Sequence, residues 1–105
     1  MVDEATFREM ALSFTDAVEQ PHFEKTSFRA KKKIFATYSS YDKRACLKLS
    51  EIDQSVFCSF NKAIVYPVPN KWGKQGWTLF ELNLIEKEML HDAMEIAYKE
   101  VTKKK

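Results

Sequence analysis

The sequence predicts an α+β fold, in which helices pack on one face of an antiparallel sheet within a single two-layer domain spanning residues 1–105. Three observations favour this fold. The chain has 105 residues, of which 45% are apolar, and this is enough for one hydrophobic core. Apolar residues recur at helical spacing near both ends. The middle consists of short segments rich in aromatic and β-branched residues. The expected order of elements is α-β-β-β-α-β-β-α.

The first expected element is an amphipathic helix over residues 4–18. Its apolar residues recur at helical spacing: Phe7, Met10, Ala11, Phe14 and Val18. Asp3 precedes them as a suitable N-cap. Because proline cannot continue a helix, we expect this one to end before Pro21.

Three short strands are expected next, over residues 27–30, 34–38 and 45–49. Polar turns separate them. The first turn is three consecutive lysines, Lys31, Lys32 and Lys33, and the second covers residues 39–43. This pattern predicts a three-stranded meander with two hairpin tips, one of which is strongly basic.

The second half predicts a short helix, two strands and a long helix. Ser50 is a suitable N-cap with Asp53 three positions later, and the short helix should end near Asn61. Residues 64–66 and 77–82 have the composition of paired strands. The last helix is expected over about residues 85–102, where apolar residues form one face: Met89, Leu90, Ala93, Met94, Ala97 and Val101.

The charges of the chain are unevenly distributed. Residues 1–24 contain one basic and six acidic side chains, whereas residues 25–74 contain eleven basic and three acidic ones. The middle of the chain is therefore a basic module with an acidic segment before it. A segment of this sign favours polyanionic partners.

Both glycines of the chain, Gly73 and Gly76, lie in one hexapeptide bounded by Trp72 and Trp77. Pro67 and Pro69 precede it, and we expect the prolines and glycines to shape the loop. One interpretation is that both tryptophans only pack. The other is that the loop contacts a nucleic acid through four side chains: Lys71, Trp72, Lys74 and Gln75. We expect a division in which Trp77 belongs to the core and Trp72 is exposed.

The lysine tip has two interpretations as well. Lys31, Lys32 and Lys33 can be a solvated hairpin end that discourages strand pairing. Alternatively they form a wing that follows a phosphate backbone, extended by Lys25 and Arg29. If this tip and the glycine loop project from one edge of the sheet, they could straddle a duplex.

No catalytic residue, metal or cofactor is expected. His22 lies near Glu24 and Lys25, but no nucleophile with an orienting partner is evident beside it. We expect His22 to hydrogen-bond backbone between the first helix and the first strand. Cys46 and Cys58 form no CxxC motif and are expected to fill the core. The chain shows no secretory signal and no membrane-spanning run, so we expect a cytoplasmic protein that does not enter membranes.

Four motifs in order resemble the MmcQ/YjbR family, and the match runs nearly end to end. They lie at residues 21–29, 33–37, 47–50 and 67–78. The resemblance implies a small α+β domain, related in shape to secretion chaperones and to frataxin, and a DNA-binding function through wing-like hairpins. Asn70 stands where members commonly have glycine, but asparagine also tolerates positive φ, so the loop should keep its shape. An iron site would need a dense acidic ridge, whereas the acids of the first helix are spread over an ordinary solvated face.

These observations predict a non-enzymatic protein that binds nucleic acid through basic hairpin tips. Double-stranded DNA, contacted at its phosphates with little sequence preference, is the expected partner. The alternative is a module that binds a small anion, a peptide or a protein in the groove between His22 and the loop of residues 67–77. A third class, an interaction domain that dimerises through the open face of its sheet, stays open, and we expect a monomer or a weak homodimer.

Overall fold

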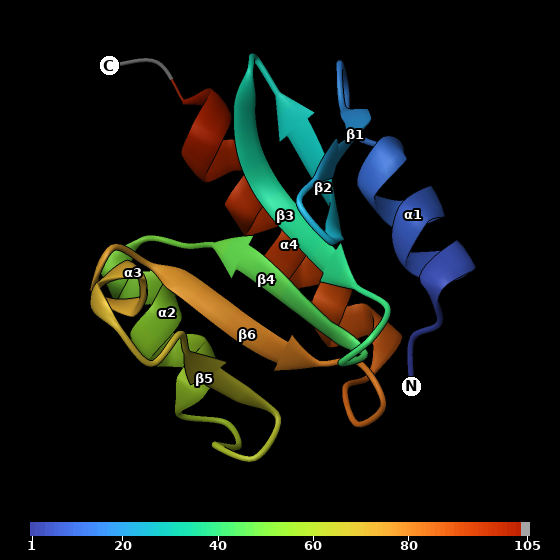
Figure 1. Cartoon of the computed structure of the whole chain (residues 1–105). Helices are drawn as coiled ribbons and strands as arrows, with labels where there is room; N and C mark the ends of the chain where they lie inside the picture. Colours follow the sequence, from blue (N-terminus) through green and yellow to red (C-terminus); the bar gives the residue numbers. More distant parts are fainter. Residues whose placement is uncertain (104–105) are drawn as a thin grey trace.

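The computed structural model describes residues 1–103. Its elements are α1 (Glu4–Leu12), β1 (Val18–His22), β2 (Lys25–Ala30), β3 (Lys33–Ser39), β4 (Arg44–Lys48), α2 (Glu51–Cys58), β5 (Val65–Pro67), α3 (Lys71–Lys74), β6 (Trp77–Glu81) and α4 (Lys87–Thr102). The strands form one antiparallel sheet in the order β1-β2-β3-β4-β6-β5 (Figure 1). The α+β class is therefore confirmed, with one more strand and one more short helix than expected.

The first helix is shorter than predicted. α1 ends at Leu12, where the hydroxyl of Ser13 donates a hydrogen bond to the carbonyl oxygen of Met10 at 2.6 Å. Asp16 then turns the chain with a φ of 64°, and Val18, expected in the helix, pairs with Arg29 as the first residue of β1. Pro21 is tolerated in β1 because this strand is at the edge of the sheet.

Helices α1, α2 and α4 pack against one face of the sheet, which we call the covered face. α4 crosses behind β3 and β4 in Figure 1 and contacts both. α1 inserts Phe7 against Phe28 of β2, with ring centroids 5.6 Å apart, and α2 places Phe57 near Phe80 of β6. Alternation along the strands sends these residues to the covered face and their neighbours to the other side.

A bulge in β3 enlarges the apolar contribution of that strand. Phe28 pairs with Ala36 and Arg29 pairs with Ile34, so Phe35 has no partner on β2. Phe35 and Ala36 are both fully buried, and the ring of Phe35 meets Tyr98 of α4 edge-on at 5.6 Å. Because the bulge turns two consecutive side chains to the covered face, the helix layer gains an additional aromatic anchor.

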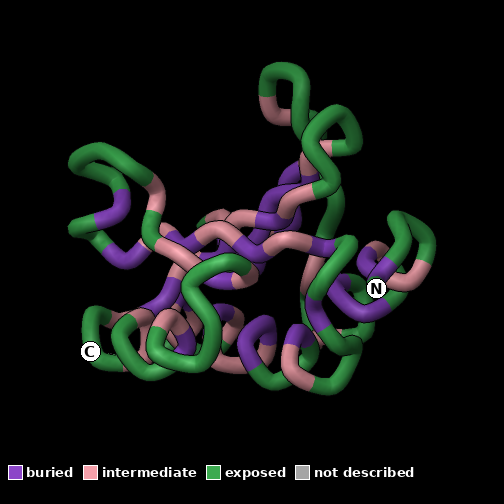
Figure 2. Tube along the Cα trace, turned by 90° about the horizontal axis from the view of Figure 1, so that it is seen from below, coloured by how far each residue is buried: buried purple, intermediate pink, exposed green. Residues whose placement is uncertain are grey.

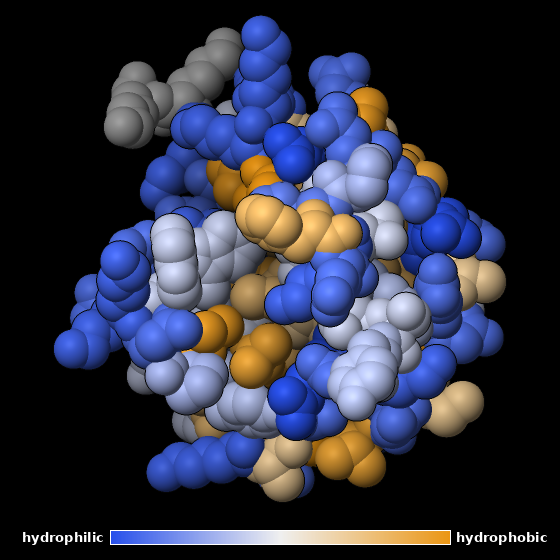
Figure 3. All heavy atoms as spheres, viewed as in Figure 1, coloured by the Kyte–Doolittle hydropathy of each residue, from blue (hydrophilic) through white to orange (hydrophobic). Residues whose placement is uncertain are grey.

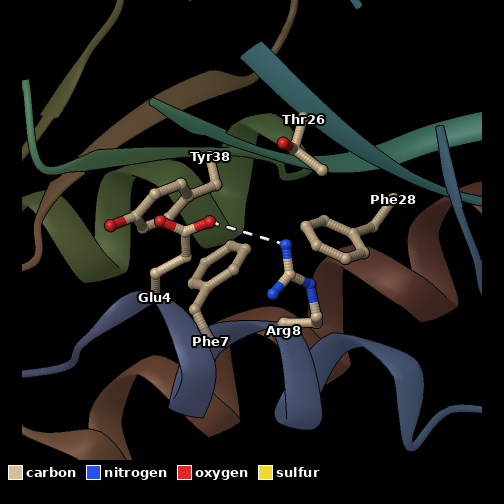
Figure 4. A pocket seen from close by; sticks show the side chains of 6 residues that line it. All are labelled: Glu4, Phe7, Arg8, Thr26, Phe28 and Tyr38. Carbon is tan, nitrogen blue, oxygen red and sulfur yellow. Dashed lines mark hydrogen bonds and ion pairs between the residues drawn. The ribbon is translucent and has the colours of Figure 1, made fainter. Parts of the chain in front are cut away.

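The seam between α1 and the sheet is closed. Glu4, Phe7, Arg8, Thr26, Phe28 and Tyr38 surround a crevice that has no room for a water molecule (Figure 4). Arg8 closes its outer side: its Nε lies 2.9 Å from Oε1 of Glu19, and this pairing raises the pKa of the guanidinium. We therefore place no ligand site in this seam.

The opposite face of the sheet carries no long helix, and we call it the uncovered face. Figure 2 shows helical coils along one side of the sheet and exposed turns projecting beyond it on the other. In Figure 3, apolar and pale side chains gather in the middle of this face, with hydrophilic side chains around them. Within residues 1–103, no helix is long and apolar enough to cross a membrane.

Candidate functional site

The loop that contains both glycines is built around the short helix α3. Asn70 caps this helix, since its Oδ1 accepts a hydrogen bond from the backbone N–H of Trp72 at 2.9 Å. Asn70 does not use the positive φ that asparagine tolerates. Its φ of −165° is extended, which is the conformation of an N-cap. This hydrogen bond fixes the backbone position from which the side chain of Trp72 projects.

Gly73 and Gly76 allow the loop to lie directly against neighbouring backbone. A Cβ atom on Gly73 would overlap the carbonyl oxygen of Val68, and one on Gly76 would overlap that of Leu49. Gly76 also has a φ of 105°, which other residues rarely adopt. Its own carbonyl accepts a hydrogen bond from the N–H of Leu49 at 2.9 Å. Close approach therefore explains both glycines, in keeping with a role in shaping the loop.

Two further residues anchor the loop to the fold. Gln54 of α2 places its Nε2 within 2.9 Å of the Gly73 carbonyl oxygen, 3.2 Å of that of Trp77 and 3.1 Å of Oγ1 of Thr78. Lys48 of β4 donates a hydrogen bond from Nζ to the carbonyl oxygen of Gln75. Pro67 ends β5, an edge strand in which a missing N–H is tolerated, and Pro69 lies between β5 and α3. The loop is thus a fixed structure rather than a free tip.

The two tryptophans lie on the uncovered face. Trp72 is 49% exposed, as expected, and Nζ of Lys71 lies 5.7 Å from the centroid of its ring system. The expectation that Trp77 belongs to the core is wrong, because it is only half-buried and lies on the uncovered face opposite Lys48. Thr78 and Phe80 of the same strand take the covered face, so alternation directs Trp77 away from the core.

A groove on the uncovered face collects residues from distant parts of the chain. Its volume is about 440 Å³, and we call it the aromatic groove. The hairpin of β1 and β2 contributes His22 and Lys25, and the central strands contribute Ile34, Thr37 and Cys46. The segment around α3 contributes Val68, Trp72 and Trp77. A smaller hollow of about 190 Å³ adjoins it, shares Lys25, Thr37, Cys46 and Val68, and extends to Arg44.

The titratable side chains of the groove are a thiol, an imidazole and an ammonium group, from Cys46, His22 and Lys25. Burial raises the pKa of the Cys46 thiol to about 11, against the opposing effect of the nearby Lys25 ammonium group, so the thiol stays protonated at neutral pH. His22 ends β1 instead of joining a helix to the first strand, and its ring meets that of Phe23 at 4.9 Å. Lys25 forms no ion pair with any residue in the described range 1–103.

The lysine tip is a tight turn with strained backbone. Ala30 pairs with Lys33, which leaves Lys31 and Lys32 as the two central residues. Their φ values are 52° and 68°, as in a type I′ hairpin turn, for which Asn-Gly is the favoured pair. Lysines at these positions therefore cost conformational energy.

The structure brings four of the predicted cations into one line. Lys25 and Arg29 lie on the uncovered side of β2, and Lys31 and Lys32 follow in the turn; we call these four the basic row. Arg29, Lys31 and Lys32 border a hollow of about 470 Å³ that Asp16 also borders. The other five predicted contacts are not part of this row: Lys33 is exposed opposite Ala30, and Lys71, Trp72, Lys74 and Gln75 belong to the α3 segment.

The two predicted tips leave the sheet at the same end but diverge. β3 begins at Lys33 and the antiparallel β4 ends at Lys48, beside Trp77, so both tips follow the same ends of the strands. In Figure 1 the turn between β2 and β3 is at the top, whereas α3 is at the left. The twist of the sheet separates them. This geometry gives little support to two tips that straddle one duplex.

Several residues of the site were not predicted. Phe23 is 93% exposed at a φ of 58° in the turn between β1 and β2. Ile34 and Thr37 of β3, Cys46 of β4 and Val68 after β5 line the groove from three separate segments. Had residues 18–22 been predicted as a strand, Phe23 would have been recognised as a turn residue. The proline and the polar residues of this segment are not typical of a strand, so the sequence did not indicate one.

Comparisons with known proteins place this arrangement in a family. The family model YjbR matches residues 12–100, and a search of curated proteins found no match. The fold is similar to that in a crystal structure of Deinococcus radiodurans protein DR2400, family-model domain DUF419, with a TM-score of 0.86. That similarity covers 99% of this chain and 81% of that chain at 19% sequence identity, so it shows the fold alone. Since the family model covers most of the sequence, the expected resemblance is confirmed, and the chain belongs to the YjbR family.

Proposed function

We propose that this chain binds nucleic acid through phosphate contacts made by the basic row, and that it acts by binding rather than by catalysis. One observation carries the proposal. Lys25, Arg29, Lys31 and Lys32 lie in line on one strand and its turn, and none of them forms an ion pair with a residue between positions 1 and 103. Phosphates along a nucleic acid strand match such a line, and the release of counterions favours their binding.

The conformation of the turn supports this proposal. Lys31 and Lys32 hold left-handed backbone that Asn-Gly would adopt at lower cost. The geometry of the turn does not explain why two lysines occupy it. A requirement for two cations at the end of the basic row would explain them. Backbone strain of this kind is characteristic of functional sites.

The proposal does not require the two tips to act on one duplex. Contacts along the basic row carry no information about base sequence, so little sequence preference follows for either duplex or single-stranded partners. Double-stranded DNA stays the expectation from the sequence. The aromatic groove is the feature that could favour unpaired strands over duplexes.

Fluorescence anisotropy with labelled oligonucleotides over a salt series tests the proposal. The logarithm of the binding constant should fall with the logarithm of salt concentration, with a slope of about −0.9 per phosphate contacted on duplex DNA. The double variant Lys31→Asn, Lys32→Gly removes two charges while keeping the favoured turn chemistry. It should weaken binding to all sequences alike and reduce the slope by roughly 2.

A matched control removes two charges from the helix layer. Lys87→Gln, Lys99→Gln changes the net charge equally but alters only exposed positions of α4. This control should retain most of the affinity and the slope. Absence of binding at low salt, or equal loss in both double variants, would contradict the proposal.

A second candidate, a small anionic ligand, has the aromatic groove in its favour. The volume of about 440 Å³ is within the roughly 300–1,000 Å³ of small-molecule sites, and Lys25 supplies one cation. A thermal-shift screen separates the two candidates. Stabilisation by an anionic metabolite at stoichiometric concentration, with no effect of oligonucleotides, would favour this second function.

A further inference from the structure

The aromatic groove has the composition of a stacking site. Trp72 from α3 and Trp77 from β6 are the two tryptophans of the chain, and both line it. About half of the surface of Trp72 is exposed, so its indole is accessible to a partner, and Lys71 adds a cation near the same ring. Flat π-systems stack on indole rings, and every nucleobase has such a face.

The backbone beneath these rings is held before any partner arrives. Asn70 caps α3, Gln54 bonds the carbonyl groups on both sides of the loop, and Gly76 lies against Leu49. A fixed loop loses little conformational freedom when it binds. The indoles are therefore presented to the uncovered face at a defined position.

The hollows of the uncovered face form a path rather than a single cavity. The aromatic groove shares four lining residues, Lys25 among them, with the smaller hollow that extends to Arg44. Lys25 thus lies at the boundary of two adjoining hollows, and the rest of the basic row continues along β2 to its turn. A polymer whose flat groups alternate with anionic groups fits this arrangement better than a compact ligand does.

We infer that the aromatic groove holds an unpaired base of a nucleic acid strand, stacked on Trp72 beside Trp77, while the adjacent phosphate pairs with Lys25. This inference rests on the proposed function and adds to it a preference for unpaired nucleotides. Bases inside a duplex are stacked on each other and cannot enter the groove.

The exposed aromatic ring at the other side of the groove belongs to the same arrangement. Phe23 follows His22, a lining residue of the groove, and stands in the turn that joins it to Lys25. Phe23 has a φ of 58° and is 93% exposed, so neither a conformational preference nor burial explains a phenylalanine at this position. A second base that leaves the groove on this side would cover its ring.

The test compares a twelve-nucleotide single strand with a strand of equal length made of abasic sites, using the full chain. Both strands carry the same phosphates, and only one has bases. The wild type should bind the base-bearing strand at least tenfold more tightly, since stacking on an aromatic ring contributes roughly that factor per base. Binding should also quench tryptophan fluorescence, which arises only from Trp72 and Trp77.

Variants of Trp72 complete the experiment. Trp72→Leu retains apolar bulk without a stacking surface, and it should bind both strands as weakly as the wild type binds the abasic one. Trp72→Phe should recover part of the difference. A melting curve for each variant confirms that it is folded before its binding is compared.

Three outcomes separate the inference from the proposed function. If the abasic and base-bearing strands bind equally well and both are salt-dependent, the base site is refuted, and the phosphate-binding function stands. If neither strand binds at low salt, the base site is refuted, and if a twelve-base-pair duplex also fails to bind, the phosphate-binding function is refuted as well. If the base-bearing strand is preferred and Trp72→Leu abolishes the preference, the inference is supported.

Discussion

The two faces of this sheet are built from the same strands but differ in burial and charge. On β6, Phe80 is fully buried under the helices, whereas Leu79, one position earlier, is half-buried on the other side. On β2, Phe28 and Ala30 are buried in the covered face, while Lys25 and Arg29 lie on the uncovered face without ion-pair partners in the range 1–103. Alternate residues of one strand therefore separate the core from the face for which we propose a binding function.

This difference teaches where strain is tolerated in the fold. The covered face is filled by aromatic contacts such as Phe7 against Phe28 and Phe35 against Tyr98. The positive φ values of Phe23, Lys31, Lys32 and Gly76 belong to turns that border hollows of the uncovered face or shape the loop beside them. The folded core supports local strain at the turns where the partner is expected to bind.

The largest expected effect is loss of stability from the covered face. Phe80→Ala should reduce the free energy of unfolding by about 3–5 kcal/mol, because it leaves a cavity among fully buried rings. Leu79→Ala, its neighbour on the uncovered face, should cost about 1 kcal/mol. Urea denaturation measures both. Equal losses would show that the uncovered face is part of the core.

Gly76→Ala should have the next largest effect. The added Cβ would overlap the carbonyl oxygen of Leu49 at a φ of 105°, so we expect a loss of roughly 1–3 kcal/mol in unfolding free energy. Gln75→Ala, at the exposed preceding position, should stay within about 0.5 kcal/mol of the wild type. If alanine at position 76 is harmless, the loop is more adaptable than its close packing indicates.

Gln54→Ala should have a smaller effect that is centred on the loop. It removes the amide that bonds the carbonyl oxygens of Gly73 and Trp77, at an expected cost of about 1–2 kcal/mol. Ser55→Ala, exposed on the same helix, should change stability very little. Tryptophan fluorescence should change in the Gln54 variant alone, because Trp72 and Trp77 lie on either side of the anchored segment. Unchanged fluorescence would mean that other contacts hold the loop.

The smallest expected effect has the opposite sign. Lys31→Asn, Lys32→Gly should raise the free energy of unfolding by about 0.5–1 kcal/mol, because asparagine and glycine adopt the left-handed backbone of these two positions at a lower conformational cost than lysine. Thermal denaturation measures the gain. A double variant that is more stable but binds nucleic acid less well would separate recognition from stability at one turn. A loss of stability would show that the lysines themselves support the turn.

The sequence is sufficient to predict elements whose pattern is local. Helical spacing located α4, and alternating short segments located β2, β3 and β4 to within about two residues at each end. Ser50 and Asp53 correctly marked the start of α2. In these elements the capping residues and the apolar period agree, so a single segment contains the information.

The missed features depend on contacts between distant segments. β1 has the sequence Val-Glu-Gln-Pro-His, and it is a strand only because β2 pairs with it. The sequence did not determine which face Trp77 takes. Trp77 and Leu79 point to one side of β6 and Phe80 to the other, and since all three are apolar, either side could have been the buried one. The aromatic groove joins residues from 22 to 77, and they come together only when the strands pair in the order of the folded sheet.

The most direct test of the central claim is a map of the binding surface by NMR. A twelve-nucleotide single strand is added to isotope-labelled protein, and the amide and indole N–H signals are followed. We expect the largest shifts at Lys25, Arg29 and Lys31 and at the side chains of Trp72 and Trp77, with little change along α4. Shifts confined to α4 or α1, or no shifts at low salt, would contradict the assignment of the uncovered face as the nucleic-acid-binding surface.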